Sequence, residues 1–171
     1  MPVEMILPLG MGFGLLGWGL VFRWYVHPLL APLNFCDAIR PLLVLHGFRY
    51  IGLMFLIPGV TAEPLDPRFT NYAAYGDLLT AVLALLALLT LSAPRTLMLS
   101  AIALFNTVGF IDLINAVTRG MMYNSVGGLG ATFWIPMVIV PMLLVSHVYI
   151  FARLYQQFRI PAQGHEQAIG H

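Results

Sequence analysis

Five long stretches of uncharged, mostly apolar residues dominate the sequence and leave few folds open to the chain. A helix needs about 20 such residues to cross the hydrocarbon layer, because unpaired backbone amides are too costly in lipid. We expect membrane-spanning helices at residues 5–25, 41–58, 72–92, 96–117 and 132–152. The predicted fold is an all-α membrane protein, a bundle of five transmembrane helices. It forms a single domain over residues 1–158, and residues 159–171 are expected to be a mobile cytoplasmic tail.

The composition excludes several classes of protein. Hydrophobic residues make up 60% of the 171 residues and charged residues 9%, against roughly 45–50% and about 25% in soluble domains. A soluble domain could not cover its surface with so few charges, which excludes a soluble enzyme and a nucleic-acid-binding protein with a basic face. The single cysteine, Cys36, can form neither an internal disulfide nor a redox pair.

Arginines determine the predicted orientation, because cytoplasmic loops of membrane proteins carry an excess of positive charge. Two arginines, Arg68 and Arg119, fall on one side of a five-helix bundle. Five fall on the other side: Arg23, Arg40, Arg95, Arg153 and Arg159. We therefore expect the N-terminus outside and the C-terminus in the cytoplasm. The start of the chain lacks the positively charged region that leads a signal peptide, so the first span is interpreted as a retained helix.

Small residues and prolines predict how the helices pack. Gly10, Gly14 and Gly17 form a smooth stripe on the first span, which allows another helix to approach closely. Packing within this chain is the favoured interpretation, and a homo-oligomer contact is the alternative. In the last span, Pro136 and Pro141 each remove a backbone donor, which predicts a bend or a widened turn there.

Ionisable residues inside the predicted spans are the strongest functional signal. A charge at membrane depth costs about 2.5–3.5 kcal/mol on insertion scales, so such residues usually face the bundle interior and have partners. By depth, Arg49 is expected to pair with Asp77 or Asp112. Two interpretations stay open: an ion pair that only fixes helix packing, and a functional pocket.

Two histidines are predicted to lie at one depth, towards the cytoplasmic side. His46 and His147 stand at similar distances from the ends of their spans, and Asn106 falls near the middle of its own. Two facing imidazoles could ligate the iron of a haem b or, with added carboxylates, a metal ion. A hydrogen bond from each ring to a carbonyl, a water or a lipid headgroup is the simpler alternative.

These polar residues belong to a longer pattern. It consists of His46-Gly47-Phe48-Arg49-Tyr50-Ile51-Gly52, Gly76-Asp77, Phe105-Asn106-Thr107-Val108-Gly109-Phe110-Ile111-Asp112-Leu113, Pro136, Pro141 and His147. The pattern resembles a family of small bacterial inner-membrane proteins for which no activity is established. The resemblance covers the second to fifth spans and implies multi-pass placement in a bacterial cytoplasmic membrane.

The sequence thus predicts a polar interior site built from His46, Arg49, Asp77, Asn106, Asp112 and His147. We expect this site to bind or pass a small ligand, ion or proton. Arg49 would hold an anionic or carbonyl-bearing ligand, while Asp77 and Asp112 would balance its charge or carry a proton. A complete transporter would need a second copy, because the chain is short and shows no inverted repeat.

Three alternatives remain. The chain could be a haem or metal redox protein that uses His46 and His147. It could be a structural or assembly subunit of a larger membrane complex. It could also be an intramembrane acid/base enzyme acting on a lipid or an isoprenoid, although no residue is assigned a catalytic role. The expected partners are membrane lipids, with a homo-oligomer or a larger complex as further candidates and no nucleic acid.

Overall fold

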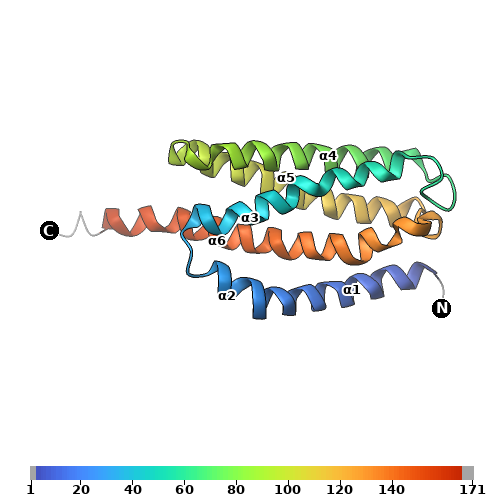
Figure 1. The fold of residues 1–171 in the computed structure, drawn as a ribbon, viewed down its shortest axis with the longest axis horizontal. Helices are drawn as coiled ribbons and strands as arrows, with labels where there is room; N and C mark the ends of the chain where they lie inside the picture. The colour runs from blue at the N-terminus through green and yellow to red at the C-terminus, as the bar shows by residue number, and fades with distance from the viewer. Residues whose placement is uncertain (1–2, 167–171) are drawn as a thin grey trace.

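The computed structural model describes residues 3–166, and the regular elements in this range are all helical (Figure 1). The long α-helices are α1 (Val3–Val21), α3 (Phe35–Gly47), α4 (Pro67–Leu89), α5 (Arg95–Met122) and α6 (Val140–Glu166). The shorter elements are the π-helices η1 (Phe22–Val26) and η6 (Ile135–Ile139), the α-helix α2 (His27–Leu30), and the 3-10 helices η2 (Phe48–Leu56), η3 (Thr90–Ser92), η4 (Val126–Gly128) and η5 (Gly130–Phe133).

Within residues 3–166, five helical segments are long and apolar enough to cross a membrane, which confirms the predicted number of long apolar helices. They are Met5–Leu30, Phe35–Leu56, Pro67–Ser92, Arg95–Met122 and Gly130–Arg159. Most contain turns that the sequence analysis left outside the spans. The predicted tail overlaps α6 as far as Glu166. Residues 167–171 lie outside the described part of the chain, and the mobility of the tail stays a prediction.

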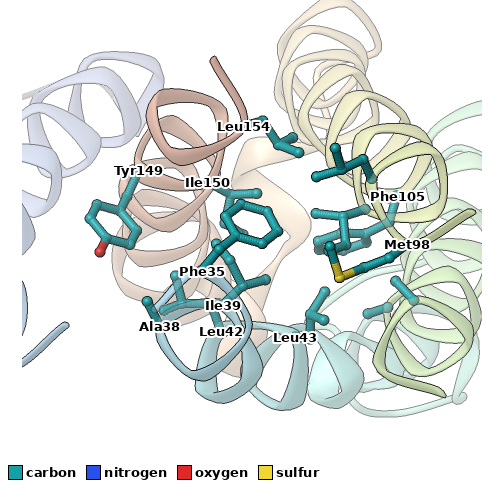
Figure 2. Packing of buried hydrophobic residues seen from close by; sticks show 14 of the residues in the cluster. Phe35, Ala38, Ile39, Leu42, Leu43, Met98, Phe105, Tyr149, Ile150 and Leu154 are labelled. Atoms are coloured by element: carbon teal, nitrogen blue, oxygen red, sulfur yellow. The ribbon is translucent and has the colours of Figure 1, made fainter. Parts of the chain in front are cut away.

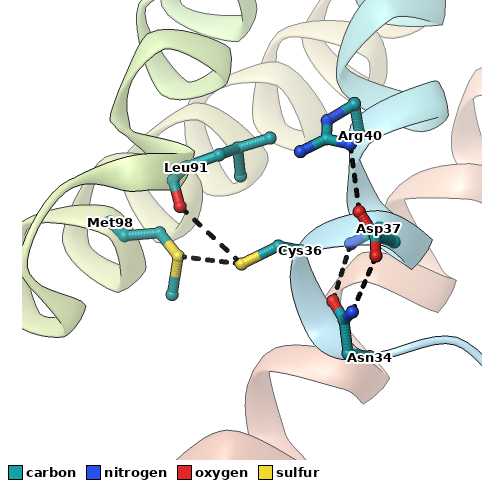
Figure 3. Close-up of polar contacts among 6 residues, drawn as sticks. All are labelled: Asn34, Cys36, Asp37, Arg40, Leu91 and Met98. Atoms are coloured by element: carbon teal, nitrogen blue, oxygen red, sulfur yellow. Dashed lines mark hydrogen bonds and ion pairs between the residues drawn. The ribbon is translucent and has the colours of Figure 1, made fainter.

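The second span begins at Phe35 and not at residue 41, because its polar first turns are capped and paired (Figure 3). The side-chain oxygen of Asn34 accepts a hydrogen bond from the backbone N–H of Asp37 at 3.0 Å. Arg40 donates to the carboxylate of Asp37, also at 3.0 Å. Hydropathy alone therefore placed the start of this helix too late.

Prolines distort two of the spans. The predicted widened turn in the last span is confirmed, because Pro136 lies in the π-helix η6. A second π-helix, η1, interrupts the first span and was not predicted. It precedes Pro28, which has no N–H to donate to the carbonyl of Trp24 and whose ring clashes with that carbonyl in a regular helix.

The first span lies at the edge of the bundle. In Figure 1, α1 and α2 run beside α6, on the side of the molecule away from α4. Among the long helices, α1 packs mainly against α6, with further contacts to η6 and η4. Only 6% of the most apolar stretch of this span is buried, against 44% for the last span. The first span is thus a peripheral helix fixed mainly through α6.

The predicted glycine stripe is divided between two environments. Gly10 faces the side chain of Met137, and Gly14 faces the Met137 carbonyl and the ring of Pro141. At Gly17, a Cβ would have no neighbouring atom within 4 Å. Gly10 and Gly14 therefore bring α1 against the last span of the same chain, and Gly17 does not.

Replacing Gly14 by leucine should push α1 away from α6 and lower stability by about 1–3 kcal/mol. A Cβ at this position would lie 2.9 Å from Cγ of Pro141. The melting temperature of the purified protein in mild detergent measures the loss. Gly17→Leu is the matched control because its position is open, and equal losses in the two variants would contradict the packing assigned to Gly14.

The largest apolar cluster, called the apolar core below, lies between the start of α3 and the C-terminal part of α6 (Figure 2). Its fully buried large side chains include Ile39, Leu43, Phe105 and Ile150. At the edge of this cluster, the Cys36 thiol lies 3.4 Å from the sulfur of Met98 (Figure 3). The polar site adjoins this cluster at Phe105.

Candidate functional site

Arg49 lies at the centre of a buried ion cluster with two aspartates. Its Nε donates to Oδ1 of Asp77 at 2.7 Å, and its Nη2 donates to Oδ2 of Asp112 at 2.5 Å. The remaining nitrogen, Nη1, donates to the carbonyl of Gly109 at 3.0 Å. The side chain of Arg49 is 1% exposed, against 15% for Asp77 and 8% for Asp112. One of the two aspartates was expected from the sequence as the partner of Arg49, and the structure pairs Arg49 with both.

Arg49, Asp77 and Asp112 lie on η2, α4 and α5, and glycines allow these segments to approach closely enough to bring the charges together. The Asp77 carboxylate lies against Gly52 of η2, where a Cβ would come within 2.7 Å of the Asp77 Cβ. The Asp112 carboxylate lies against Gly76 of α4, where a Cβ would come within 2.7 Å of the Asp112 Cγ. Each carboxylate therefore occupies space that any other residue would fill. The sequence pattern contained both glycines, but their position beneath the carboxylates emerges only from helix packing.

His46 and His147 lie in contact in the middle of the bundle, with ring centroids 4.2 Å apart. His147 Nδ1 is 2.7 Å from the side-chain oxygen of Asn106, and the Asn106 amide donates to the His147 carbonyl at 3.2 Å. His46 Nε2 is 2.7 Å from the Ser146 hydroxyl, which donates to the Leu143 carbonyl at 2.9 Å. All these groups are buried. The sequence analysis missed Ser146, because its partner lies on another helix.

These hydrogen bonds determine the tautomers of the two histidines. The Ser146 hydroxyl uses its proton on a carbonyl, so it accepts one from Nε2 of His46. The Asn106 oxygen can only accept, so Nδ1 of His147 is the donor. In the neutral rings, Nδ1 of His46 and Nε2 of His147 are therefore lone-pair acceptors. Both atoms are buried and have no hydrogen-bond partner.

The histidine pair does not fit a haem. A porphyrin ligated by both side chains would have to lie between them, and rings with centroids 4.2 Å apart leave no space for it. Within residues 3–166, no group of three or more His, Cys, Asp or Glu side chains could hold a metal ion. The redox alternative therefore gains no support from this geometry.

The histidine pair and the ion cluster meet at Gly109 of α5. A Cβ on this residue would lie 2.8 Å from Cε1 of His147, 3.0 Å from Nη1 of Arg49 and 2.6 Å from Cγ2 of Thr80. Only a glycine leaves room for both polar groups at this point. The structure thus joins the six predicted site residues in one interior array.

The carboxylates adjoin cavities on one side and a groove on the other. A cavity of about 150 Å³ is lined by Arg49 and Asp77 together with apolar side chains. A smaller one, of about 40 Å³, is lined by Asp77 and by Ser125, whose buried hydroxyl has no partner. On the opposite face, Asp112 borders a groove of about 570 Å³ between α4 and α5. The histidines instead contact Phe105 of the apolar core.

The sequence was compared with known families, curated proteins and solved structures. A family model described as "Domain of unknown function (DUF8737)" matches residues 6–155. The chain belongs to the DUF8737 family. The DUF8737 match includes the six site residues and also the first span, which the resemblance seen in the sequence did not cover. No curated protein and no solved structure matches the chain.

Proposed function

We propose that this chain binds a proton within the membrane at the Arg49–Asp77–Asp112 cluster. The observation that carries the proposal is that two carboxylates share one buried guanidinium. When all three groups are ionised, their charges of +1, −1 and −1 sum to −1. An unbalanced charge at this depth is costly, and uptake of one proton by either carboxylate makes the cluster neutral.

The contacts of Arg49 favour a proton over an anionic ligand. Each nitrogen of its guanidinium already donates to Asp77, Asp112 or the Gly109 carbonyl. An anion at Arg49 would have to compete with the two carboxylates for this guanidinium, and it would add a further negative charge to the cluster. The sequence suggested that Arg49 holds an anionic or carbonyl-bearing ligand. In this proposal Arg49 instead holds the two carboxylates that share the proton.

The surroundings favour access from one end of the bundle. The smaller cavity beside Asp77 extends towards Ser125, which follows α5 at the end of the bundle where η4 lies. In the opposite direction, Phe105, Ile39 and Ile150 belong to the apolar core and are fully buried. With the predicted orientation, the end with Ser125 faces the outside. This conformation supports binding, and permeation would require a second conformation in which the core opens.

Infrared difference spectroscopy of the protein in nanodiscs tests the proposal. Lowering the pH should produce the C=O band of a buried protonated carboxyl group. Asp77→Asn and Asp112→Asn should each remove or displace this band, because the remaining carboxylate is then balanced by Arg49 and no longer needs a proton.

Asp66→Asn is the matched control. Asp66 precedes α4 and accepts hydrogen bonds from Arg68, which lower the pKa of this carboxyl below its ordinary value. Removal of Asp66 should leave the buried band in place. A wild-type protein without such a band over the pH range in which it stays folded would contradict the proposal. So would a band that persists in both Asp77→Asn and Asp112→Asn.

A further inference from the structure

A groove of about 570 Å³ runs between the first span and α6, away from the ion cluster. Along most of its length it is apolar, with Leu15 and Phe22 on one wall and Leu144 and Val148 on the other. Its polar lining consists of His27, Tyr149, Arg153 and Gln156. The groove is therefore amphipathic, and its polar residues are not scattered along it.

The direction of the helices gathers these polar residues at one end. Both α1 and α6 run from the N-terminal side of Figure 1 towards the side where the C-terminus lies. His27 of α2 and Arg153 of α6 follow the apolar residues along their own segments, so they lie at the same end of the groove. The rings of His27 and Tyr149 are 6.1 Å apart. Figure 2 shows Tyr149 at the edge of the apolar core, with its hydroxyl directed away from the cluster.

Arg153 is positioned with donors to spare. Its Nη2 donates to the Leu33 carbonyl at 2.9 Å, and its Nη1 donates to the Tyr149 hydroxyl at 3.4 Å. A guanidinium has five N–H groups, so these two contacts leave three of them for another acceptor. With His27 alongside, this end of the groove suits a phosphate group.

The stretch of the groove from Leu144 to Arg153 is close in length to the thickness of one leaflet of a bilayer. From Leu144 to Arg153 the helix rises about 13 Å at about 1.5 Å per residue. Half of the hydrocarbon core of a bilayer is about 15 Å thick. An acyl chain that follows the apolar walls would therefore place its headgroup at the level of Arg153 and His27.

We propose that this groove binds one anionic phospholipid, with an acyl chain between the first span and α6 and its phosphate at Arg153 and His27. Charge complementarity at one end and the apolar walls that lead to it identify this occupant. The proposal does not depend on proton binding at Arg49.

Photocrosslinking in nanodiscs tests this assignment. The protein is reconstituted in phosphatidylcholine with a trace of photoactivatable phosphatidylglycerol or, separately, of photoactivatable phosphatidylcholine. Mass spectrometry of the digested protein then locates the adducts. Crosslinks of phosphatidylglycerol should map to residues 15–31 and 144–156 and exceed those of phosphatidylcholine about fivefold, since one basic side chain near the headgroups contributes about that factor. Arg153→Gln should reduce phosphatidylglycerol to the level of phosphatidylcholine.

Two controls separate lipid binding from loss of the fold. Arg40→Gln removes another exposed arginine, which pairs with Asp37 and does not line the groove, and should leave the crosslinks unchanged. Val148→Trp should fill the groove and abolish them, whereas Val82→Trp, at a similarly exposed position on α4, should not. Equal crosslinking of both lipids in the wild type would overturn the proposal. So would a dimer seen by native mass spectrometry with the groove free of lipid adducts.

Discussion

Replacing Arg49 by glutamine should lower the free energy of unfolding by about 3–5 kcal/mol, because removing one member of a buried ion cluster leaves the others uncompensated. Here two carboxylates lose their common partner at once, since Asp77 and Asp112 both pair with Arg49. Unfolding of the protein in mixed micelles by increasing fractions of a denaturing detergent measures the change. The deficit should shrink at low pH, where protonated carboxyl groups no longer repel each other.

Arg40→Gln supplies the comparison for this loss. Arg40 and Asp37 form an ion pair of similar length, at 3.0 Å, but their side chains are 56% and 44% exposed. Exposed pairs contribute about 0–1 kcal/mol, so this variant should unfold almost like the wild type. If Arg49→Gln were as mild, the cluster would have to be hydrated, and the requirement for a balancing proton would disappear.

The number of spans could be predicted from the sequence because it follows from a local property. An apolar stretch long enough to cross a bilayer is visible without knowing its neighbours, and all five such stretches are helical in the structure. Helix limits were less certain, because capping by Asn34 and pairing of Asp37 add polar turns that hydropathy excludes. The π-helix before Pro28 was not predicted for a similar reason, because hydropathy does not depend on whether a residue has a backbone N–H.

The members of the polar site could be predicted, but most of their partners could not. The depth of a residue follows from the constant rise of a helix, which placed His46 level with His147 and Arg49 near two aspartates. Which helices are neighbours, and at what rotation, depends on packing between distant parts of the chain. For that reason the sequence could not distinguish one aspartate from two.

Ser146 and Gly109 illustrate what packing adds. Ser146 was not among the predicted site residues, and its partner is His46 on α3. Gly109 is the point where the histidine pair and the ion cluster meet, a role that depends on the absence of a side chain. A polar residue in the interior of an apolar span was a usable signal for Ser146. Gly109 stood in the sequence pattern Phe105–Leu113, but nothing in that pattern indicated that two polar groups would meet there.

Replacing either aspartate alone should change the free energy of unfolding little, whereas replacing both together should lower it strongly. Asp77→Asn or Asp112→Asn alone leaves Arg49 with one carboxylate, so the cluster becomes neutral and stability should change little. The double variant leaves the guanidinium, which is 1% exposed, without an anion, and should lose about 3–5 kcal/mol. The same micelle unfolding assay compares the three proteins with the wild type.

The shape of this series distinguishes a shared proton site from two independent ion pairs. If each aspartate contributed separately, the two single losses would add up to the loss of the double variant. If one negative charge is surplus, each single variant is nearly neutral and the double variant is not, because the first substitution removes only the charge that a proton otherwise balances. Adding Arg49→Gln to the double variant should then recover most of the lost stability, since no buried charge remains. A triple variant as unstable as the double one would show that packing, and not charge, governs this cluster.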